Sequence, residues 1–211
     1  MSQTVVVILT KDPVPGRVKT RLIPALGTDG AARLHVAMVL ATVSRVQATG
    51  LPVTVSLRGD PAGPFAHGLR SLGCHVEPQA EGDLGARLEH ALRGHGRRIA
   101  IGTDSPTFEP GWLLDAARAP TAAAYGPSED GGYWCVSVDA TGGTSDTGRL
   151  FRNIPWSRPD TLESSLARAR ACGLGVSLLP TCYDIDEPPM LARLAADPRC
   201  PPAIRPHLPF S

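Results

Sequence analysis

Four basic side chains crowd into one short loop near the start of the chain. The loop is the stretch KDPVPGRVKTRL at residues 11–22, and its cations are Lys11, Arg17, Lys19 and Arg21. The prolines and Gly16 of this stretch exclude a helix and keep the backbone open. Because cations at this density repel one another unless an anion lies among them, the pattern favours a phosphate-binding loop. A solvated basic loop is the alternative, since most short charge runs lie on the surface.

Carboxylates follow two of the segments that we expect to be strands. Asp104 lies in GTDSP after the apolar residues 99–101, and Asp184 and Asp186 follow the apolar segment 175–179. Strand ends of open α/β sheets form the crevice where ligands bind, so Asp104 is expected to face the basic loop. Mg²⁺ is usually held by one or two carboxylates together with phosphate oxygens. The pattern favours Asp104 as a metal ligand, with a second carboxylate available from the later pair.

Each of these carboxylates also has a purely structural interpretation. Asp104 could form an Asx turn or cap a helix over residues 109–117. The pair of Asp184 and Asp186 could cap a final helix over residues 188–196, because Asp before a helix that starts with Pro is ordinary. Residue types alone leave both interpretations open.

A glycine-rich turn, GPSEDGGYW at residues 126–134, separates two further expected strands. The tripeptide at 130–132 suits a hairpin, because Asp-Gly and Gly-Gly tolerate positive φ. Adjacent glycines equally allow a ligand to approach the backbone closely. In that case Glu129, Asp130 and Tyr133 would hold hydroxyl groups of an acceptor or a sugar.

The rest of the pattern predicts the frame that positions these groups. Residues 5–9 indicate a buried strand, and Thr28 or Asp29 is expected to begin a helix that ends near Gly50. Strands are expected at 53–57, 74–77 and 99–101, with helices at 64–72 and after Asp83. Repeated strand–helix units predict a doubly wound, largely parallel sheet. Further strands are expected at 122–125, 134–138 and 175–179, a surface loop at 141–148, and helices starting near Pro159 and Pro188.

Length and composition exclude several classes of protein. The 211 residues fit one domain, and 21 basic against 20 acidic residues leave a formal charge of +1. This balance provides no overall field to attract nucleic acid or an anionic membrane, so neither is an expected partner. The five cysteines are scattered without a C-x-x-C pair, which argues against a disulfide framework and a zinc site. Without a signal sequence or a membrane-spanning segment, a cytoplasmic location is expected.

Four segments together resemble the motifs of a small bacterial family in the nucleotide-diphospho-sugar transferase superfamily. They are KDPVPGRVKTRL, GTDSP, GPSEDGGYW and the final DID at 184–186, and the similarity spans residues 4 to about 194. Members are usually labelled glycosyltransferases and are often encoded near radical-SAM or selenium-related genes. Lys11 with KTRL is also similar to the guanylyltransferases that act on phospholactate or phosphoenolpyruvate. The resemblance implies one GT-A domain, a Rossmann-like α/β/α sandwich with a mostly parallel mixed sheet.

The resemblance also implies roles, position by position. Lys11, Lys19 and Arg21 would bind the nucleotide phosphates, with Gly16 and Arg17 in the same loop. Mg²⁺ or Mn²⁺ would be held by Asp104 and Asp186, and Asp83 would lie near the nucleotide. The residues that would face a small-molecule acceptor are Glu129, Asp130, Gly131, Gly132 and Tyr133. Relatives commonly continue the final motif with Thr and a further Asp, whereas Glu187 follows here, which affects the helix cap more than the metal role.

The expected reaction is nucleotidyl transfer from an NTP to a small phosphorylated acceptor, with release of pyrophosphate. Such transfers need positioning and neutralisation of charge, so the expected catalytic residues are Lys19, Arg21 and Asp104. One alternative is glycosyl transfer from an NDP-sugar bound in the same site. Another is a protein that binds a nucleotide without catalysis. The dense cations favour a triphosphate over a sugar diphosphate.

Overall fold

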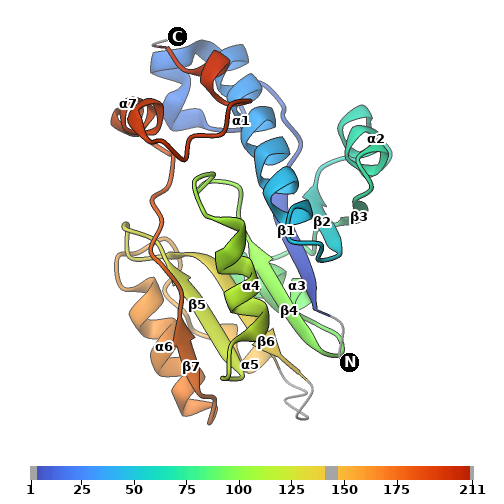
Figure 1. Ribbon diagram of the computed structural model, residues 1–211, viewed down its shortest axis with the longest axis vertical. Helices are drawn as coiled ribbons and strands as arrows, with labels where there is room; N and C mark the ends of the chain where they lie inside the picture. Colours follow the sequence, from blue (N-terminus) through green and yellow to red (C-terminus); the bar gives the residue numbers. More distant parts are fainter. Residues whose placement is uncertain (1–3, 141–146, 210–211) are drawn as a thin grey trace.

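In the computed structural model, seven strands form one sheet within the described residues, 4–140 and 147–209 (Figure 1). The strands are β1 (Val5–Lys11), β2 (Val53–Arg58), β3 (His75–Pro78), β4 (Arg97–Ile101), β5 (Ala123–Pro127), β6 (Tyr133–Asp139) and β7 (Val176–Leu178). Their spatial order is β3-β2-β1-β4-β6-β5-β7. Neighbouring strands are parallel except that β6 runs antiparallel to β4 and β5. The mostly parallel, mixed sheet predicted from the sequence is confirmed.

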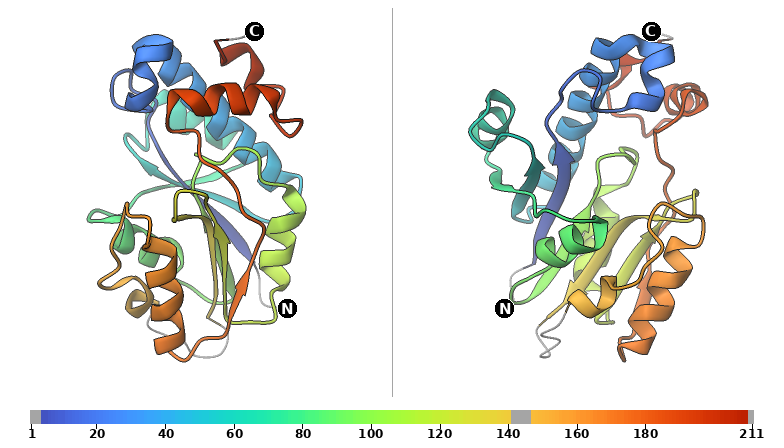
Figure 2. Two further views of the ribbon diagram at one scale, coloured as in Figure 1. Left: turned by 90° about the vertical axis from the view of Figure 1, so that its left-hand side faces the viewer. Right: turned by 180° about the vertical axis from the view of Figure 1, so that it is seen from behind.

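Helices cover both faces of this sheet (Figure 2). Those of the described residues are α1 (Ile23–Gln47), α2 (Pro64–Ser71), α3 (Leu84–Ala91), α4 (Pro110–Arg118), α5 (Gly148–Phe151), α6 (Thr161–Ala171) and α7 (Pro188–Ala196), with the 3₁₀ helices η1 (Thr20–Leu22) and η2 (Arg205–His207). Buried side chains of α1, α2 and α4 pack on one face, and those of α3, α5 and α6 on the other. None of these helices is long and apolar enough to cross a membrane. Residues 141–146 of the expected surface loop lie outside the described residues.

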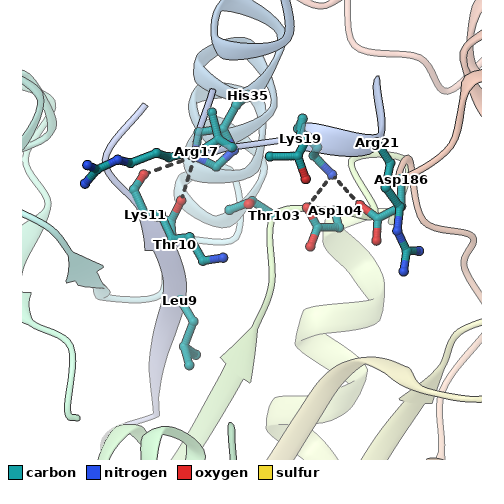
Figure 3. A pocket seen from close by; sticks show the side chains of 12 residues that line it. Leu9, Thr10, Lys11, Arg17, Lys19, Arg21, His35, Thr103, Asp104 and Asp186 are labelled. Carbon is teal, nitrogen blue, oxygen red and sulfur yellow. Dashed lines mark hydrogen bonds and ion pairs between the residues drawn. The ribbon is translucent and has the colours of Figure 1, made fainter. Parts of the chain in front are cut away.

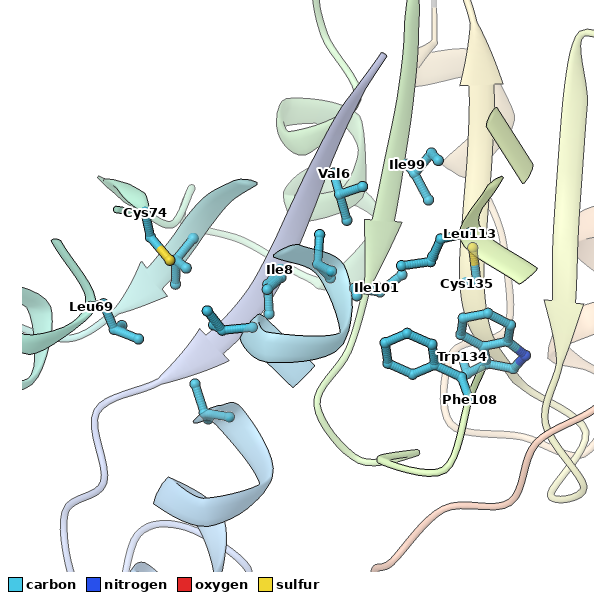
Figure 4. Packing of buried hydrophobic residues seen from close by; sticks show 14 of the residues in the cluster. Val6, Ile8, Leu69, Cys74, Ile99, Ile101, Phe108, Leu113, Trp134 and Cys135 are labelled. Carbon is cyan, nitrogen blue, oxygen red and sulfur yellow. The ribbon is translucent and has the colours of Figure 1, made fainter. Parts of the chain in front are cut away.

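Strand β1 shows why residues 5–9 form an uninterrupted apolar run. Successive side chains of a strand point to opposite faces, so Val6 and Ile8 join the cluster beneath α1 (Figure 4). Val7 joins the cluster on the other face. All three side chains are fully buried. A strand covered on both sides needs apolar residues at every position.

A third apolar cluster joins the two ends of the chain. Leu22, Leu34 and Met38 pack against Tyr183, Ile185, Leu191 and Leu194. The backbone of α1 is non-helical at Gly27, where φ is 69°. This break lies directly before the helix start predicted at Thr28 or Asp29. Because Ile185 is buried in this cluster, the adjacent Asp186 is held beside Lys19, shortly before the start of α1.

Candidate functional site

The carboxyl ends of β1 and β4 meet the segment before α7 at one pocket (Figure 3). Its volume is about 280 Å³. The predicted groups that line it are the four loop cations and two carboxylates: Lys11, Arg17, Lys19, Arg21, Asp104 and Asp186. The convergence expected from strand-end topology is therefore present.

Lys19 lies at the centre of this pocket and connects three distant segments. Its Nζ donates hydrogen bonds to Asp104 Oδ1 at 2.5 Å, to the Ile185 carbonyl at 2.8 Å and to Asp186 Oδ1 at 3.0 Å. The side chain is 4% exposed. An ammonium group has three N–H donors, so all three are used within the protein. In this arrangement Lys19 positions the two carboxylates, and no donor remains for a nucleotide phosphate.

The local backbone directs Lys19 inward. Lys19 has the left-handed φ of 46° and immediately precedes η1, while Gly16 supplies a second positive φ of 79°. Val18 and Leu22 are buried, so the loop is anchored at both sides of Lys19. Arg21, by contrast, is 72% exposed, and its one ion pair within the described residues is a long one of 3.7 Å with Glu187. The four loop cations are therefore not equivalent.

Electrostatic coupling keeps the Lys19 cluster charged. Burial alone lowers the pKa of Lys19, but the Asp104 and Asp186 carboxylates outweigh it and raise the pKa. Partial burial likewise opposes ionisation of Asp104, yet Lys19 holds the pKa of Asp104 below its ordinary value. The pocket at neutral pH therefore contains an ammonium group between two carboxylates.

Asp104 and Asp186 fit a divalent ion. Lys19 engages one oxygen of each carboxylate, and the side chains are 49% and 50% exposed toward the pocket. Within the described residues no three His, Cys, Asp or Glu side chains are grouped to hold a metal ion by themselves. Mg²⁺ typically takes only one or two carboxylates and completes its shell with substrate and water oxygens. Neither aspartate caps a helix, because α4 and α7 have Glu109 and Glu187 at their N-cap positions.

Asp184 has a different environment from Asp186, although the two are only two residues apart. Its Oδ1 accepts a hydrogen bond from the Ser105 hydroxyl. Burial, with a contribution from the Asp104 and Asp130 charges, raises the pKa of Asp184 to about 6. Asp184 does not line the pocket and instead holds the segment against the loop after β4.

A second pocket of about 260 Å³ adjoins the first on the α3 side. The two share Leu9, Thr10, Lys11 and Asp104. The residues that line it include Gln79, Leu84, Arg87, Tyr133 and Trp134. Asp83, predicted to lie near a nucleotide, is the N-cap of α3 and accepts a hydrogen bond from the Ala86 amide at 2.9 Å. It therefore fixes the helix whose side chains line this pocket.

The predicted acceptor turn is a hairpin between β5 and β6. Glu129 is bound by Arg193 of α7 through two hydrogen bonds of 2.5 and 2.7 Å, and Arg193 also lies over the Tyr183 ring. Asp130 accepts a hydrogen bond from the Gly132 amide. Of the five predicted acceptor residues, only Tyr133 lines either of the two pockets. The Glu129 carboxylate therefore connects this turn to α7, and the Asp130 carboxylate closes the turn itself.

His35 is a pocket residue that sequence reasoning missed. Its Nε2 donates to the Lys11 carbonyl at 3.0 Å, and the side chain is buried beneath the basic loop (Figure 3). Burial lowers the pKa of His35, which keeps the imidazole neutral beside Lys11 and Lys19. The available signal was a polar residue on the apolar face of α1, between Leu34 and Met38.

Residues 40–158 match the family described as "Uncharacterized protein conserved in bacteria (DUF2064)", which covers more than half of the chain. The chain belongs to this family. The matched segment includes Asp104 and the turn at 126–134, whereas the basic loop and Asp186 lie outside it. A search of curated proteins finds no match to this DUF2064 protein.

Solved structures share the fold of this DUF2064 protein over nearly its whole length. A protein from Desulfovibrio desulfuricans G20, provisionally named a nucleotide-diphospho-sugar transferase, is 25% identical with a TM-score of 0.84, covering 97% of this chain and 93% of that chain. CMP:2-keto-3-deoxy-manno-octonic acid synthetase, complexed with CTP, is 15% identical with a TM-score of 0.58, covering 92% and 98%. The inositol-1-phosphate CTP transferase from T. maritima is 15% identical with a TM-score of 0.57, covering 90% and 91%. These neighbours carry the names of transferases or of a CTP-dependent synthetase, and the superfamily resemblance predicted from the motifs is confirmed.

Gly131→Ala is expected to destabilise the protein by about 2 kcal/mol. Gly131 has a φ of 89°, and an added Cβ would lie 1.9 Å from the Pro159 carbonyl oxygen. That clash would also disturb the hydrogen bond from the Leu162 amide to the Gly131 carbonyl. The matched control is Gly173→Ala, where φ is 77° but no atom lies within 4 Å, and the expected cost is about 1 kcal/mol. Thermal unfolding measures both, and equal losses would contradict the packing argument.

Proposed function

We propose that this DUF2064 protein is a Mg²⁺-dependent transferase that uses a nucleotide-activated donor. The observation that carries the proposal is the pocket in which Lys19 lies between Asp104 and Asp186. Cations of an open loop and paired carboxylates in one pocket suit phosphate groups and a divalent ion. The name of the Desulfovibrio protein, whose fold covers 97% of the chain, supports the same class.

Among such reactions we favour nucleotidyl transfer. An oxygen of a phosphorylated acceptor forms a bond to the α-phosphorus of an NTP. The bond from the α-phosphorus to the oxygen that bridges it to the β-phosphorus breaks, and pyrophosphate leaves with the electron pair of that bond. Because the acceptor oxygen is already anionic, no proton has to be removed. Catalysis then consists of positioning and of neutralising the phosphate oxygens.

The chain's own residues divide this work. Lys11 and Arg17 line the pocket and use no side-chain donor within the described residues, so they are suited to contact phosphate oxygens. Lys19 keeps the two carboxylates in place. Asp104 and Asp186 would hold Mg²⁺, which when bound supplies positive charge to the phosphate oxygens. The second pocket, lined by Gln79, Leu84 and Arg87, adjoins Lys11 and has room for the remainder of a donor or acceptor.

Glycosyl transfer is the second candidate, and the name of the Desulfovibrio protein favours it. In that reaction the same pocket would hold the diphosphate of an NDP-sugar, and the nucleoside diphosphate would leave from the sugar carbon. Both candidates require the phosphate-facing cations and the two carboxylates. They differ in whether phosphorus or carbon is attacked.

Incubation of the purified protein with each NTP, Mg²⁺, pyrophosphatase and a panel of small phosphorylated acids tests the proposal. We expect phosphate release that requires one NTP, one acceptor and the metal. Cleavage of an NDP-sugar without activity on any NTP would favour glycosyl transfer. Nucleotide binding without turnover of either donor would indicate a binding protein and contradict the proposed reaction.

A further inference from the structure

Strands β1 and β2 end on two like charges placed side by side. Lys11 and Arg58 are register partners in this parallel pair, so their side chains leave the same face of adjacent strands. Neighbouring strands lie about 4.8 Å apart, and like charges at directly paired positions are destabilising. Such a pair at the ligand-binding edge of an open sheet is accounted for if an anion binds between the two cations.

The two cations line a third pocket, of about 460 Å³, together with Arg17. All three side chains are exposed, and within the described residues none of them makes a side-chain hydrogen bond or an ion pair. Figure 3 shows the Arg17 side chain turned away from Lys19 and Asp104. Arg17 is thus oriented away from the carboxylates that would otherwise neutralise it.

The single acid in this lining is already used by the protein. The Asp60 amide donates to Asp12 Oδ2 at 2.7 Å, and the Asp12 amide donates to the Arg58 carbonyl at 3.0 Å. Gly59 makes this possible, because a Cβ there would lie 2.1 Å from Asp12 Oδ2. Asp12 therefore fixes the ends of β1 and β2 against each other, and the pocket keeps a net positive lining.

We propose that Lys11, Arg17 and Arg58 form a subsite for the terminal phosphate groups of a polyphosphate. Lys11 and Arg17 also line the pocket that contains Asp104 and Asp186, so one chain of phosphates can extend from the carboxylates to Arg58. The identification of that polyphosphate as the donor NTP rests on the proposed function. Arg58 is then a specificity-determining residue that distinguishes an NTP from an NMP or from an NDP-sugar, whose corresponding end is uncharged.

Calorimetric titration of the full chain with inorganic tripolyphosphate in metal-free buffer tests the subsite directly. Arg58→Gln keeps a polar side chain of similar length and removes the charge, and about tenfold weaker binding is expected. The matched control is Arg118→Gln, an exposed arginine at the end of α4, which is expected to bind within about twofold of the wild type. Removing a like charge beside Lys11 should leave the melting temperature without ligand unchanged or higher, which verifies folding.

A second titration with NTP and NMP links the subsite to the reaction. Arg58→Gln is expected to weaken NTP binding about tenfold and to change NMP binding by less than about twofold. Unchanged tripolyphosphate binding in Arg58→Gln would overturn the subsite, even if the wild type turns over an NTP. If instead tripolyphosphate binding depends on Arg58 while the wild type binds no NTP, the subsite stands and the proposed function fails.

Discussion

Lys19→Met is expected to lower the free energy of unfolding by about 3 kcal/mol near pH 7. The methionine side chain is of similar length but cannot donate to Asp104, Asp186 or the Ile185 carbonyl. Removing one partner of a buried ion pair costs about 3–5 kcal/mol, and we take the lower end because the two carboxylates are half-exposed. Urea unfolding followed by circular dichroism measures the difference.

Arg21→Met is the matched control for this substitution. Arg21 belongs to the same loop and carries the same charge, but it is exposed and only loosely paired with Glu187. Exposed ion pairs of this kind contribute little to stability, so the free energy of unfolding is expected to change by no more than about 0.5 kcal/mol. If the two variants lost equal stability, Lys19 would not be the residue that joins the three segments.

The stability difference between the wild type and Lys19→Met should also depend on pH. In the wild type, Lys19 holds the pKa of Asp104 below its ordinary value although the carboxylate is partly buried. Such a carboxylate stabilises the fold above its unfolded pKa of about 3.9, and this contribution is lost as the pH falls through the lower folded pKa. The difference should therefore be largest near neutral pH and shrink below about pH 4. A difference that stayed constant through this range would argue against the charge pairing.

The meeting of the basic loop with Asp104 could be predicted because it depends on topology. Apolar segments 5–9 and 99–101 both indicated buried strands, and the loops after parallel neighbouring strands begin at the same edge of the sheet. In the structure β1 and β4 are parallel neighbours. Local signals were equally informative, since Asp83 caps α3 as its position before Leu84 indicated.

The direction of the Lys19 side chain could not be predicted. Loop composition assigned Lys19 to phosphate together with Lys11 and Arg21, but side-chain direction depends on a left-handed backbone at Lys19 that no residue type requires. Its partners lie 85 and 167 residues away in the sequence. Such a contact is fixed only by packing, here the burial of Leu22 against Ile185.

Glu129 shows the same limit in the acceptor turn. The turn chemistry of Asp130 and the following glycines was visible locally, and the hairpin formed. The partner of Glu129 is Arg193, 64 residues away on α7, and this pairing has no local signature. Residues whose role depends on sequence neighbours were therefore predictable, and residues whose role depends on a distant helix were not.

Asp104→Asn is expected to reduce the proposed transferase activity about 10²–10³-fold, as removal of a preorganised charged contact typically does. The amide keeps the size of the side chain and a carbonyl oxygen that can accept from Lys19 Nζ. Stability should therefore fall by only about 1 kcal/mol. Pyrophosphate release, measured at saturating acceptor, gives the activity, and nucleotide titration with and without Mg²⁺ gives the metal dependence. We expect that the wild type binds the nucleotide more tightly with Mg²⁺ and that the variant does not.

Asp184→Asn separates this effect from a general loss of negative charge. Asp184 lies on the same segment as Asp186 but does not line the pocket, and it accepts a hydrogen bond from Ser105. Burial raises the pKa of Asp184 to about 6, so the protein stabilises its charged form less than that of an ordinary aspartate, and the amide keeps an oxygen that can accept from Ser105. The transferase activity of Asp184→Asn is expected to fall by less than about tenfold. Similar losses of activity in Asp104→Asn and Asp184→Asn would mean that Asp104 acts through the fold. If nucleotide binding by Asp104→Asn still became tighter with Mg²⁺, Asp104 would be excluded as a ligand of the metal.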